Sequence, residues 1–343
     1  LIYILKMKTI KEILHLIYGF LQFSATERNS EKSHQAFVKL YSISNGISNS
    51  MFSLIIKISN YFSRKKKNNI FLSKNSNNIK INDDQNIVLQ NIKEKGYFKF
   101  DSKLNNEICE DIIRHIYSIQ GYGNKDEKRK INVIERKNDI NYINFHEKDL
   151  MKNKSLQKLS VNEFFLNISR NYFGSEPILS NIGIAITYPT NQPMSEFAQL
   201  YHFDLDRIKW LKFFIYLSDV SLEEGPHSYI EGTHKVLGKP YELVKKGYKR
   251  ITDEEFFRYV DKSKEKMVIG EKGTIFVGDS SAFHKGNNPK KNNRIMLQFE
   301  YCNSLFGSKI DKVEISEDIF DKNTFSVENI KTSKLFSRFN FLS

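Results

Sequence analysis

The sequence is poor in cysteine, with only Cys109 and Cys302 in 343 residues, and their separation is not that of a metal-binding pair. Two distant cysteines argue against a disulfide framework and favour a reducing compartment, so we expect a cytoplasmic protein. The chain also lacks an uninterrupted apolar run of the roughly 20 residues that a spanning helix needs. It shows no internal repeat. These absences leave a folded protein without a transmembrane segment, built on a core to which 40% hydrophobic residues contribute.

Positive charge is the most conspicuous excess, with a net charge of +13 and a pI near 9.3. A strongly basic chain invites a nucleic-acid partner. Here the lysines are spread along the chain and accompany heavy use of asparagine and isoleucine, which is typical of compositional bias. The one dense basic run is "SRKKKNN" at residues 63–69. We therefore expect no nucleic-acid partner, and keep binding through the basic N-terminal region as an alternative.

The N-terminal segment predicts an amphipathic helix from Met7 onward. Its polar face is formed by Lys8, Lys11, Glu12, His15, Gly19 and Gln22. Its apolar face is formed by Ile10, Ile13, Leu14, Ile17 and Leu21. We expect this apolar face to pack against the main domain, with peripheral contact to a membrane surface as the alternative.

Changes of composition divide the chain into four predicted regions. These are a helical extension (1–63), a linker rich in lysine and asparagine (64–85), a main domain (86–307) and a C-terminal tail (308–343). The main domain begins with a short helix that stops at Gly96, the strand 97–100 and a helix over 104–119. A further helix over 161–172 is closed by Gly174, and short strands with alternating apolar residues dominate the rest.

The order of these elements indicates the fold class. Strands are predicted in "SNIGIAITYP", "AQLYHFDLD", "LKFFIYLSDV", "HSYIEGTH", "GTIFVGDSSAFH" and "RIMLQFEYC". They follow one another with few helices between them, which disfavours a parallel doubly wound sheet. We predict a mainly β fold with flanking helices, a double-stranded β-helix or jelly roll with helices packed on one sheet.

A candidate metal site lies in "YHFD", residues 201–204. In a strand His202 and Asp204 point to the same face, so one imidazole and one carboxylate are offered side by side. His284, at the end of a later predicted strand, is the candidate third ligand. Two histidines and a carboxylate form the facial triad that suits non-heme Fe(II) and leaves coordination positions open. Arg294 opens the next strand and could hold a carboxylate through two charge-assisted hydrogen bonds.

The surroundings of these residues resemble a known family. "HFD" (202–204), "KFFIYLSDV" (212–220) and "GPHSYIEGTH" (225–234), with "GTIFVGDSSAFHKG" and Arg294, resemble the phytanoyl-CoA dioxygenase family of Fe(II)- and 2-oxoglutarate-dependent oxygenases. The resemblance covers roughly residues 86–303. The first 80 residues and the tail have no counterpart in it.

The resemblance implies roles for individual residues. His202, Asp204 and His284 match the iron ligands, and Arg294 matches the residue that pairs with the distal carboxylate of 2-oxoglutarate. Lys212 and Phe214 lie where the family sometimes lines the cosubstrate pocket, although Lys212 could equally pair with a structural carboxylate. The resemblance gives His227 and His234 no ligand role, and it implies turn and packing roles for both.

The resemblance also implies a reaction. Fe(II), 2-oxoglutarate and O2 would together hydroxylate an unactivated C–H bond, with release of succinate and CO2. The carboxylate of Asp204 points to hydroxylation, because halogenating relatives carry a small residue in its place. A non-catalytic jelly-roll protein that binds a metal or ligand remains the alternative.

Two polar segments, 124–150 and 239–266, are the predicted lids over the pocket. Both are basic, which suggests a small-molecule substrate that is anionic or linked to a carrier. The alternative is that both segments are ordinary loops whose charges are simply solvated.

Overall fold

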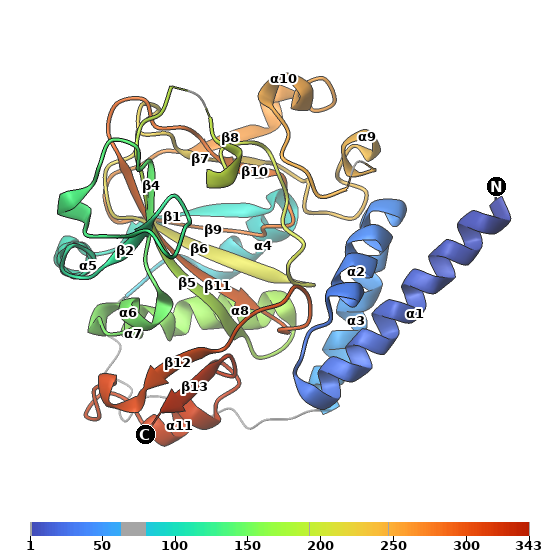
Figure 1. Cartoon of the computed structure of the whole chain (residues 1–343), viewed down its shortest axis with the longest axis horizontal. Helices are drawn as coiled ribbons and strands as arrows, with labels where there is room; N and C mark the ends of the chain where they lie inside the picture. Colours follow the sequence, from blue (N-terminus) through green and yellow to red (C-terminus); the bar gives the residue numbers. More distant parts are fainter. Residues whose placement is uncertain (1, 63–79, 192, 246, 343) are drawn as a thin grey trace.

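The computed structural model describes residues 2–62, 80–191, 193–245 and 247–342. Most of the predicted linker, residues 64–85, falls outside these ranges. The described chain is organised around two antiparallel sheets with helices beside them (Figure 1). The larger sheet runs in the order β1 (Tyr97–Lys103), β9 (Thr274–Gly278), β6 (Trp210–Tyr216), β11 (Arg294–Cys302), β5 (Ile178–Thr187), β4 (Tyr142–Asn144), β2 (Gly121–Gly123) and β3 (Lys130–Ile131). The smaller sheet contains β10 (His284–Gly286), β7 (His227–Ile230) and β8 (Glu265–Val268).

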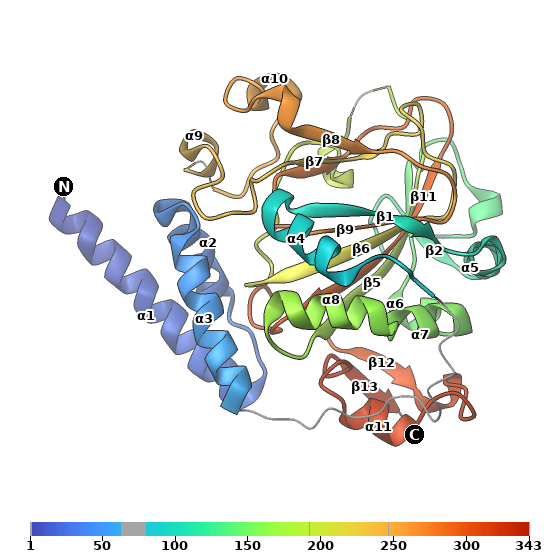
Figure 2. The ribbon, with the colours of Figure 1, turned by 180° about the vertical axis from the view of Figure 1, so that it is seen from behind.

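Helices cover one face of the larger sheet (Figures 1 and 2). They are α4 (Gln85–Lys95), α5 (Asn106–Ser118), α6 (Glu147–Leu150), α7 (Lys154–Ser160) and α8 (Glu163–Phe173). The predicted glycine stops are confirmed, because Gly96 and Gly174 adopt the left-handed conformation that ends α4 and α8. Asn105 caps α5 by accepting a hydrogen bond from the backbone N–H of Glu107. The predicted strands and the helices packed on one sheet are thus present, in a mixed arrangement of helix and antiparallel sheet, while the jelly-roll topology stays a prediction.

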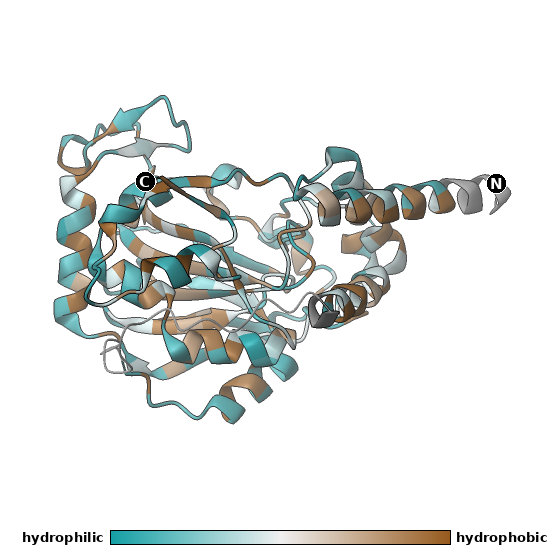
Figure 3. Cartoon of the chain, turned by 90° about the horizontal axis from the view of Figure 1, so that it is seen from below, coloured by the Kyte–Doolittle hydropathy of each residue, from teal (hydrophilic) through white to brown (hydrophobic). Residues whose placement is uncertain are grey.

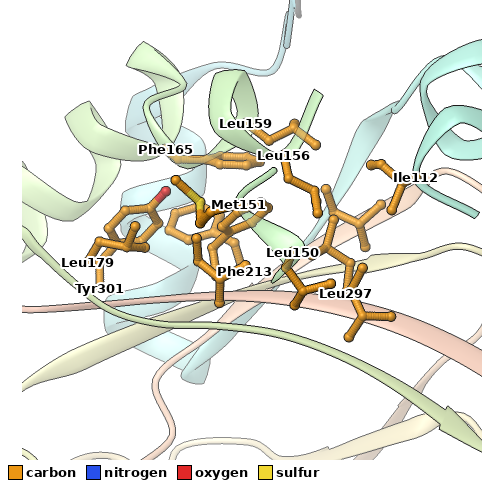
Figure 4. Close-up of a cluster of buried hydrophobic side chains, with 14 of the residues drawn as sticks. Ile112, Leu150, Met151, Leu156, Leu159, Phe165, Leu179, Phe213, Leu297 and Tyr301 are labelled. Carbon is orange, nitrogen blue, oxygen red and sulfur yellow. The ribbon is translucent and has the colours of Figure 1, made fainter. Parts of the chain in front are cut away.

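Side chains of β6 point alternately to the two faces of the larger sheet, so one face contributes to the hydrophobic core and the other to the candidate site. Phe213 faces the helices and packs against Phe165 of α8, with ring centroids 4.4 Å apart. Figure 4 shows the surrounding apolar cluster between sheet and helices. Lys212 and Phe214 point to the opposite face, because neighbouring residues of a strand alternate. The sheet therefore buries one face against helices and presents the other to the smaller sheet.

The N-terminal helices α1 (Ile2–Thr26), α2 (Glu31–Ser44) and α3 (Ile47–Phe62) form a lobe beside the sheets (Figure 1). The lobe contacts the segment around residues 203–205, which contains part of the candidate site. The ring of Tyr41 lies 5.6 Å from that of Phe203, and the imidazole of His34 bonds the carbonyl of Leu205. None of the helices in the described ranges has both the length and the apolar character that crossing a bilayer requires.

The orientation of α1 corrects the prediction made for its apolar face. The helix buries Leu16 and Gly19, whereas the predicted apolar face, with Leu14 and Leu21 about 60% exposed, is turned outward. Gly19 decides this orientation, since a Cβ there would lie 2.2 Å from that of Ser33 in α2. A residue without a side chain allows the two helices to approach closely. The packing surface of α1 is therefore centred on Gly19, on the side predicted to be polar.

The remaining elements are short. The segment 239–266 contains α9 (Tyr241–Val244) and α10 (Asp253–Phe256), and the tail forms β12 (Val313–Ser316), α11 (Val327–Thr332) and β13 (Phe339–Leu342). Single 3₁₀ turns occur at Val133–Glu135, Ser195–Phe197, Lys262–Lys264 and Glu317–Ile319. β12 and β13 pair in parallel. Arg338 ties the tail to the main domain through an ion pair with Glu147 of α6.

Candidate metal centre

The predicted strand "AQLYHFDLD" is not a regular strand, although it carries two of the candidate ligands. Tyr201 pairs with Ile251, and His202 pairs with His284, each as an isolated bridge. Because successive residues take backbone partners from different segments, no continuous ladder forms. The bridge between His202 and His284 uses both possible N–H to carbonyl bonds, at 3.0 and 2.8 Å. This backbone pairing places the two histidines side by side.

The structure brings together the three predicted ligands. Their ligand atoms lie within 4.8 Å of one another. The Nε2 atom of His202 is 3.8 Å from Oδ1 of Asp204, and that of His284 is 3.6 Å from Oδ2. Each Nδ1 lies within hydrogen-bond distance of a backbone carbonyl, that of Leu200 or Ala282. Donation from Nδ1–H leaves the Nε2 lone pairs directed at the common centre, as in histidines that bind metals.

Burial and charge favour the ligating forms of these groups. Burial lowers the pKa of both His202 and His284, so the imidazoles are neutral at neutral pH. Burial alone would raise the pKa of Asp204, but the adjacent Lys212 ammonium outweighs it and holds that pKa well below its usual range. Two neutral imidazoles and one carboxylate are the protonation states in which such residues bind a divalent metal.

Lys212 forms an ion pair with the carboxylate of the candidate ligand Asp204. Its Nζ donates to Oδ2 of Asp204 at 2.9 Å and lies 3.5 Å from Oε2 of Glu300. Its pKa is raised despite burial, because these two carboxylates surround it. The hydroxyl of Tyr248, from the segment 239–266, donates to Oδ1 of Asp204 at 3.2 Å. Each oxygen of the candidate ligand therefore has one donor that fixes its direction.

Arg294 is 3% exposed at the start of β11, beside the end of β10. Nη1 donates to the carbonyl of Asn287 at 3.3 Å, while Nε has no hydrogen-bond partner. Within the described ranges no carboxylate lies in ion-pair distance of this guanidinium. A Cβ on Gly286, two residues after His284, would lie 2.7 Å from Nη2. The cation is thus held close to the candidate ligands, and the glycine leaves room for it.

Phe214 is linked to the candidate ligands by a cluster of aromatic rings. Its ring is 4.9 Å from that of His227, which in turn is 5.5 Å from the imidazole of His284. Both ring nitrogens of His227 and the hydroxyl of Tyr229 are buried without a partner in the described part of the chain. From the sequence, His227 was given only a turn or packing role. Its place beside Phe214 and His284 could not be foreseen, because these residues come from separate strands. His234 lies apart from this cluster, with its Nε2 bonded to the carbonyl of Lys93.

Two further cations come from the predicted lids and were not singled out by the sequence. These are Lys125 and Arg250. Burial is the main cause that lowers the pKa of Lys125, and the positive charges of Arg250 and Lys212 lower it further. The charge of Arg250 also acts on His202 and His284, and its buried Nη1 has no partner among the described residues. Basic residues in both lids were the only signal available in the sequence.

Comparison with known proteins gives no family assignment. No family model and no curated protein matches the chain. Among solved structures, HygX from Streptomyces hygroscopicus with nickel and 2-oxoglutarate bound is 14% identical, with a TM-score of 0.47 over 66% of this chain and 89% of that one. The α-ketoglutarate-dependent epimerase SnoN from nogalamycin biosynthesis is 11% identical, with a TM-score of 0.44 over 64% and 82%. EvdO2 from Micromonospora carbonacea, complexed with 2-oxoglutarate, is 12% identical, with a TM-score of 0.46 over 65% and 92%. At these values, the function has to be inferred from the site itself.

Proposed function

We propose that the chain is an Fe(II)- and 2-oxoglutarate-dependent oxygenase of the phytanoyl-CoA dioxygenase type, built on a double-stranded β-helix. His202, Asp204 and His284 would hold the iron. The fit is supported by the donor set, since two nitrogens and one oxygen on one side of a metal are the protein ligands of non-heme Fe(II) oxygenases. It is also supported by the neutral imidazoles and ionised carboxylate that burial and charge favour.

The observation that carries the proposal is the guanidinium of Arg294. A buried cation is normally paired, and this one has no carboxylate partner among the described residues and a free Nε. It lies beside Gly286, two residues from a candidate ligand. The distal carboxylate of 2-oxoglutarate would supply the missing anion. The rings of His227 and Tyr229 lie 5.5 and 5.9 Å from that of His284, and their buried polar atoms, which have no partner in the described ranges, would be available for the remaining oxygens.

The residues around the site would orient the metal ligands and shield the reaction from water. Lys212 and Tyr248 hold the carboxylate of Asp204 in place, and the buried aromatic rings around His227 would exclude water from the site. When bound, iron would supply the activation of dioxygen, while 2-oxoglutarate is converted to succinate and CO2 and one oxygen atom enters a substrate C–H bond. The retained carboxylate favours hydroxylation over halogenation.

The lid residues favour an anionic substrate, either a small molecule or a metabolite linked to a carrier. Lys212 is neutralised by Asp204 and Glu300, and Arg294 is assigned to 2-oxoglutarate. Lys125 and Arg250 remain as cations near the metal ligands, and neither forms an ion pair within the described ranges. A carboxylate or phosphate on the substrate would meet both of them, which would also fix its orientation.

An anaerobic titration with Fe(II) and 2-oxoglutarate tests the proposal. The chelate of the two should give a weak visible charge-transfer band, and air should then convert 2-oxoglutarate to succinate. Asp204→Ala should abolish the band, whereas Arg294→Met should retain metal binding and weaken 2-oxoglutarate binding. A wild-type protein that binds metal but neither binds 2-oxoglutarate nor forms succinate would instead be a non-catalytic binding protein.

A further inference from the structure

Exposed apolar side chains are concentrated in the N-terminal lobe. Half of the exposed large apolar residues of the described chain lie within its first 62 residues. On α1 they are Ile10, Ile13, Leu14, Ile17, Tyr18 and Leu21, between 42% and 69% exposed. Single exposed apolar residues are ordinary, but a contiguous patch of this kind marks an interaction surface.

The patch on α1 follows from how the lobe is built. α1 packs on α2 around Gly19, and Phe20 reaches Phe306 of the main domain with ring centroids 5.4 Å apart. These contacts lie on one side of the helix. The side richest in isoleucine and leucine is thereby turned away from the protein, and Figure 3 shows apolar residues recurring along α1 where it projects from the body.

The charge of the same region indicates what would cover this patch. Residues 1–69 contain eleven Lys and Arg residues, three Glu and no Asp. Glu12 is ion-paired with Lys39, while Lys11 is exposed beside the patch. Within the described residues 2–62 alone, seven Lys and Arg stand against three Glu. An amphipathic helix in a segment with an excess of basic residues matches a surface that is both apolar and anionic.

We propose that the N-terminal lobe binds the surface of an anionic lipid bilayer, with the outward face of α1 inserted at the boundary between headgroups and acyl chains. The lysines would meet the lipid phosphates. Binding would be peripheral, in agreement with the lack of a spanning helix among those described. The lobe packs against the segment that carries His202 and Asp204, so the candidate metal centre would be held near the membrane. The proposal does not depend on the reaction proposed above.

Co-sedimentation of the full chain with vesicles tests this inference. We expect binding to vesicles of phosphatidylcholine and phosphatidylglycerol, and at least about tenfold weaker binding to phosphatidylcholine alone. Leu14→Glu combined with Leu21→Glu should reduce binding to anionic vesicles more than about tenfold. Ile134→Glu is the matched control, because Ile134 is 80% exposed outside the lobe. It should bind like the wild type.

A second variant separates charge from apolar insertion. Replacing Lys11, which is exposed beside the patch, with Gln should weaken binding to anionic vesicles by roughly fivefold. Light scattering and a gel shift with duplex DNA identify other occupants. A dimer that Leu14→Glu with Leu21→Glu converts to a monomer, without vesicle binding by the wild type, would overturn the proposal in favour of a second copy. DNA binding without vesicle binding would overturn it in favour of nucleic acid.

Discussion

Replacing Lys212 with methionine tests how the candidate metal ligand is held. The ammonium lies 2.9 Å from Asp204 and 3.5 Å from Glu300, and all three side chains are at most 15% exposed. Methionine has a similar length and no charge, so two buried carboxylates would lose their shared cation. Removing one partner from a buried ion pair typically costs about 3–5 kcal/mol. We expect the free energy of unfolding, measured with denaturant, to fall by about that amount.

The same substitution should weaken metal binding. Without the ammonium the pKa of Asp204 rises and its carboxylate loses a fixed direction. Residues that orient a metal ligand typically contribute about 10- to 100-fold to metal affinity. We therefore expect Lys212→Met to raise the dissociation constant of Fe(II) by about that factor, measured anaerobically by competition with a chelating dye. At saturating metal, binding of 2-oxoglutarate should be nearly unchanged, because Arg294 and the open coordination positions are retained.

Two comparisons make this prediction specific. Lys103 forms an ion pair of 2.8 Å with Glu271, but both side chains are more than half exposed. Lys103→Met should therefore cost less than about 1 kcal/mol. Adding Glu300→Gln to Lys212→Met should restore part of the lost stability, because one of the two unpaired charges is removed. If Lys212→Met binds Fe(II) normally but loses affinity for 2-oxoglutarate, Lys212 contacts the cosubstrate and the positioning role is refuted.

Three further outcomes are expected. Burial lowers the pKa of Lys239 from 10.5 to about 7, so between these pH values the unfolded chain binds a proton that the folded chain does not. The free energy of unfolding of the wild type, relative to that of Lys239→Met, should therefore rise by up to about 1.4 kcal/mol per pH unit over this window. A difference that does not change with pH would contradict this expectation. Gly286→Ala should displace the guanidinium of Arg294 and weaken 2-oxoglutarate binding about 10- to 100-fold with normal metal affinity, which parallel titrations would show. Tyr248→Phe removes a hydrogen bond to Asp204, and a dissociation constant for Fe(II) raised about 3- to 10-fold is expected, whereas an unchanged value would mean that the lid does not orient the ligand.

The parts of the fold that sequence predicts well are those with local causes. β6 follows from the alternation of "LKFFIYLSDV", since every second residue enters the core under the helices. The ends of α4 and α8 follow from Gly96 and Gly174, because glycine tolerates the left-handed conformation that closes a helix. Of the candidate ligands, His202 and Asp204 also follow from a short spacing, whereas His284 lies far along the chain and was identified by its place at the end of a later strand and by the family resemblance; the structure brings all three together. Apart from His284, each of these features depends on residues that are neighbours in the chain.

The features that sequence missed depend on partners far along the chain. His202 was expected in a regular strand, but its backbone is held by His284, and Tyr201 is held by Ile251. A carboxylate partner for Lys212 was among the expectations, but its identity as Glu300 follows from the register of β6 and β11, which no local pattern specifies. These pairings exist only once the two sheets have assembled around the site.

The error on α1 has the same physical origin and leads to a different conclusion. Hydrophobic periodicity identifies which face of a helix avoids water, but not whether protein or lipid covers it. Gly19 allows α1 to approach Ser33 of α2 more closely than any other residue would, so close backbone packing selects a face that periodicity calls polar. The face that periodicity calls apolar is then left uncovered by the described protein. Its isoleucines and leucines are therefore better explained by an external apolar partner than by the fold, and the adjacent lysines favour a partner with negative charge.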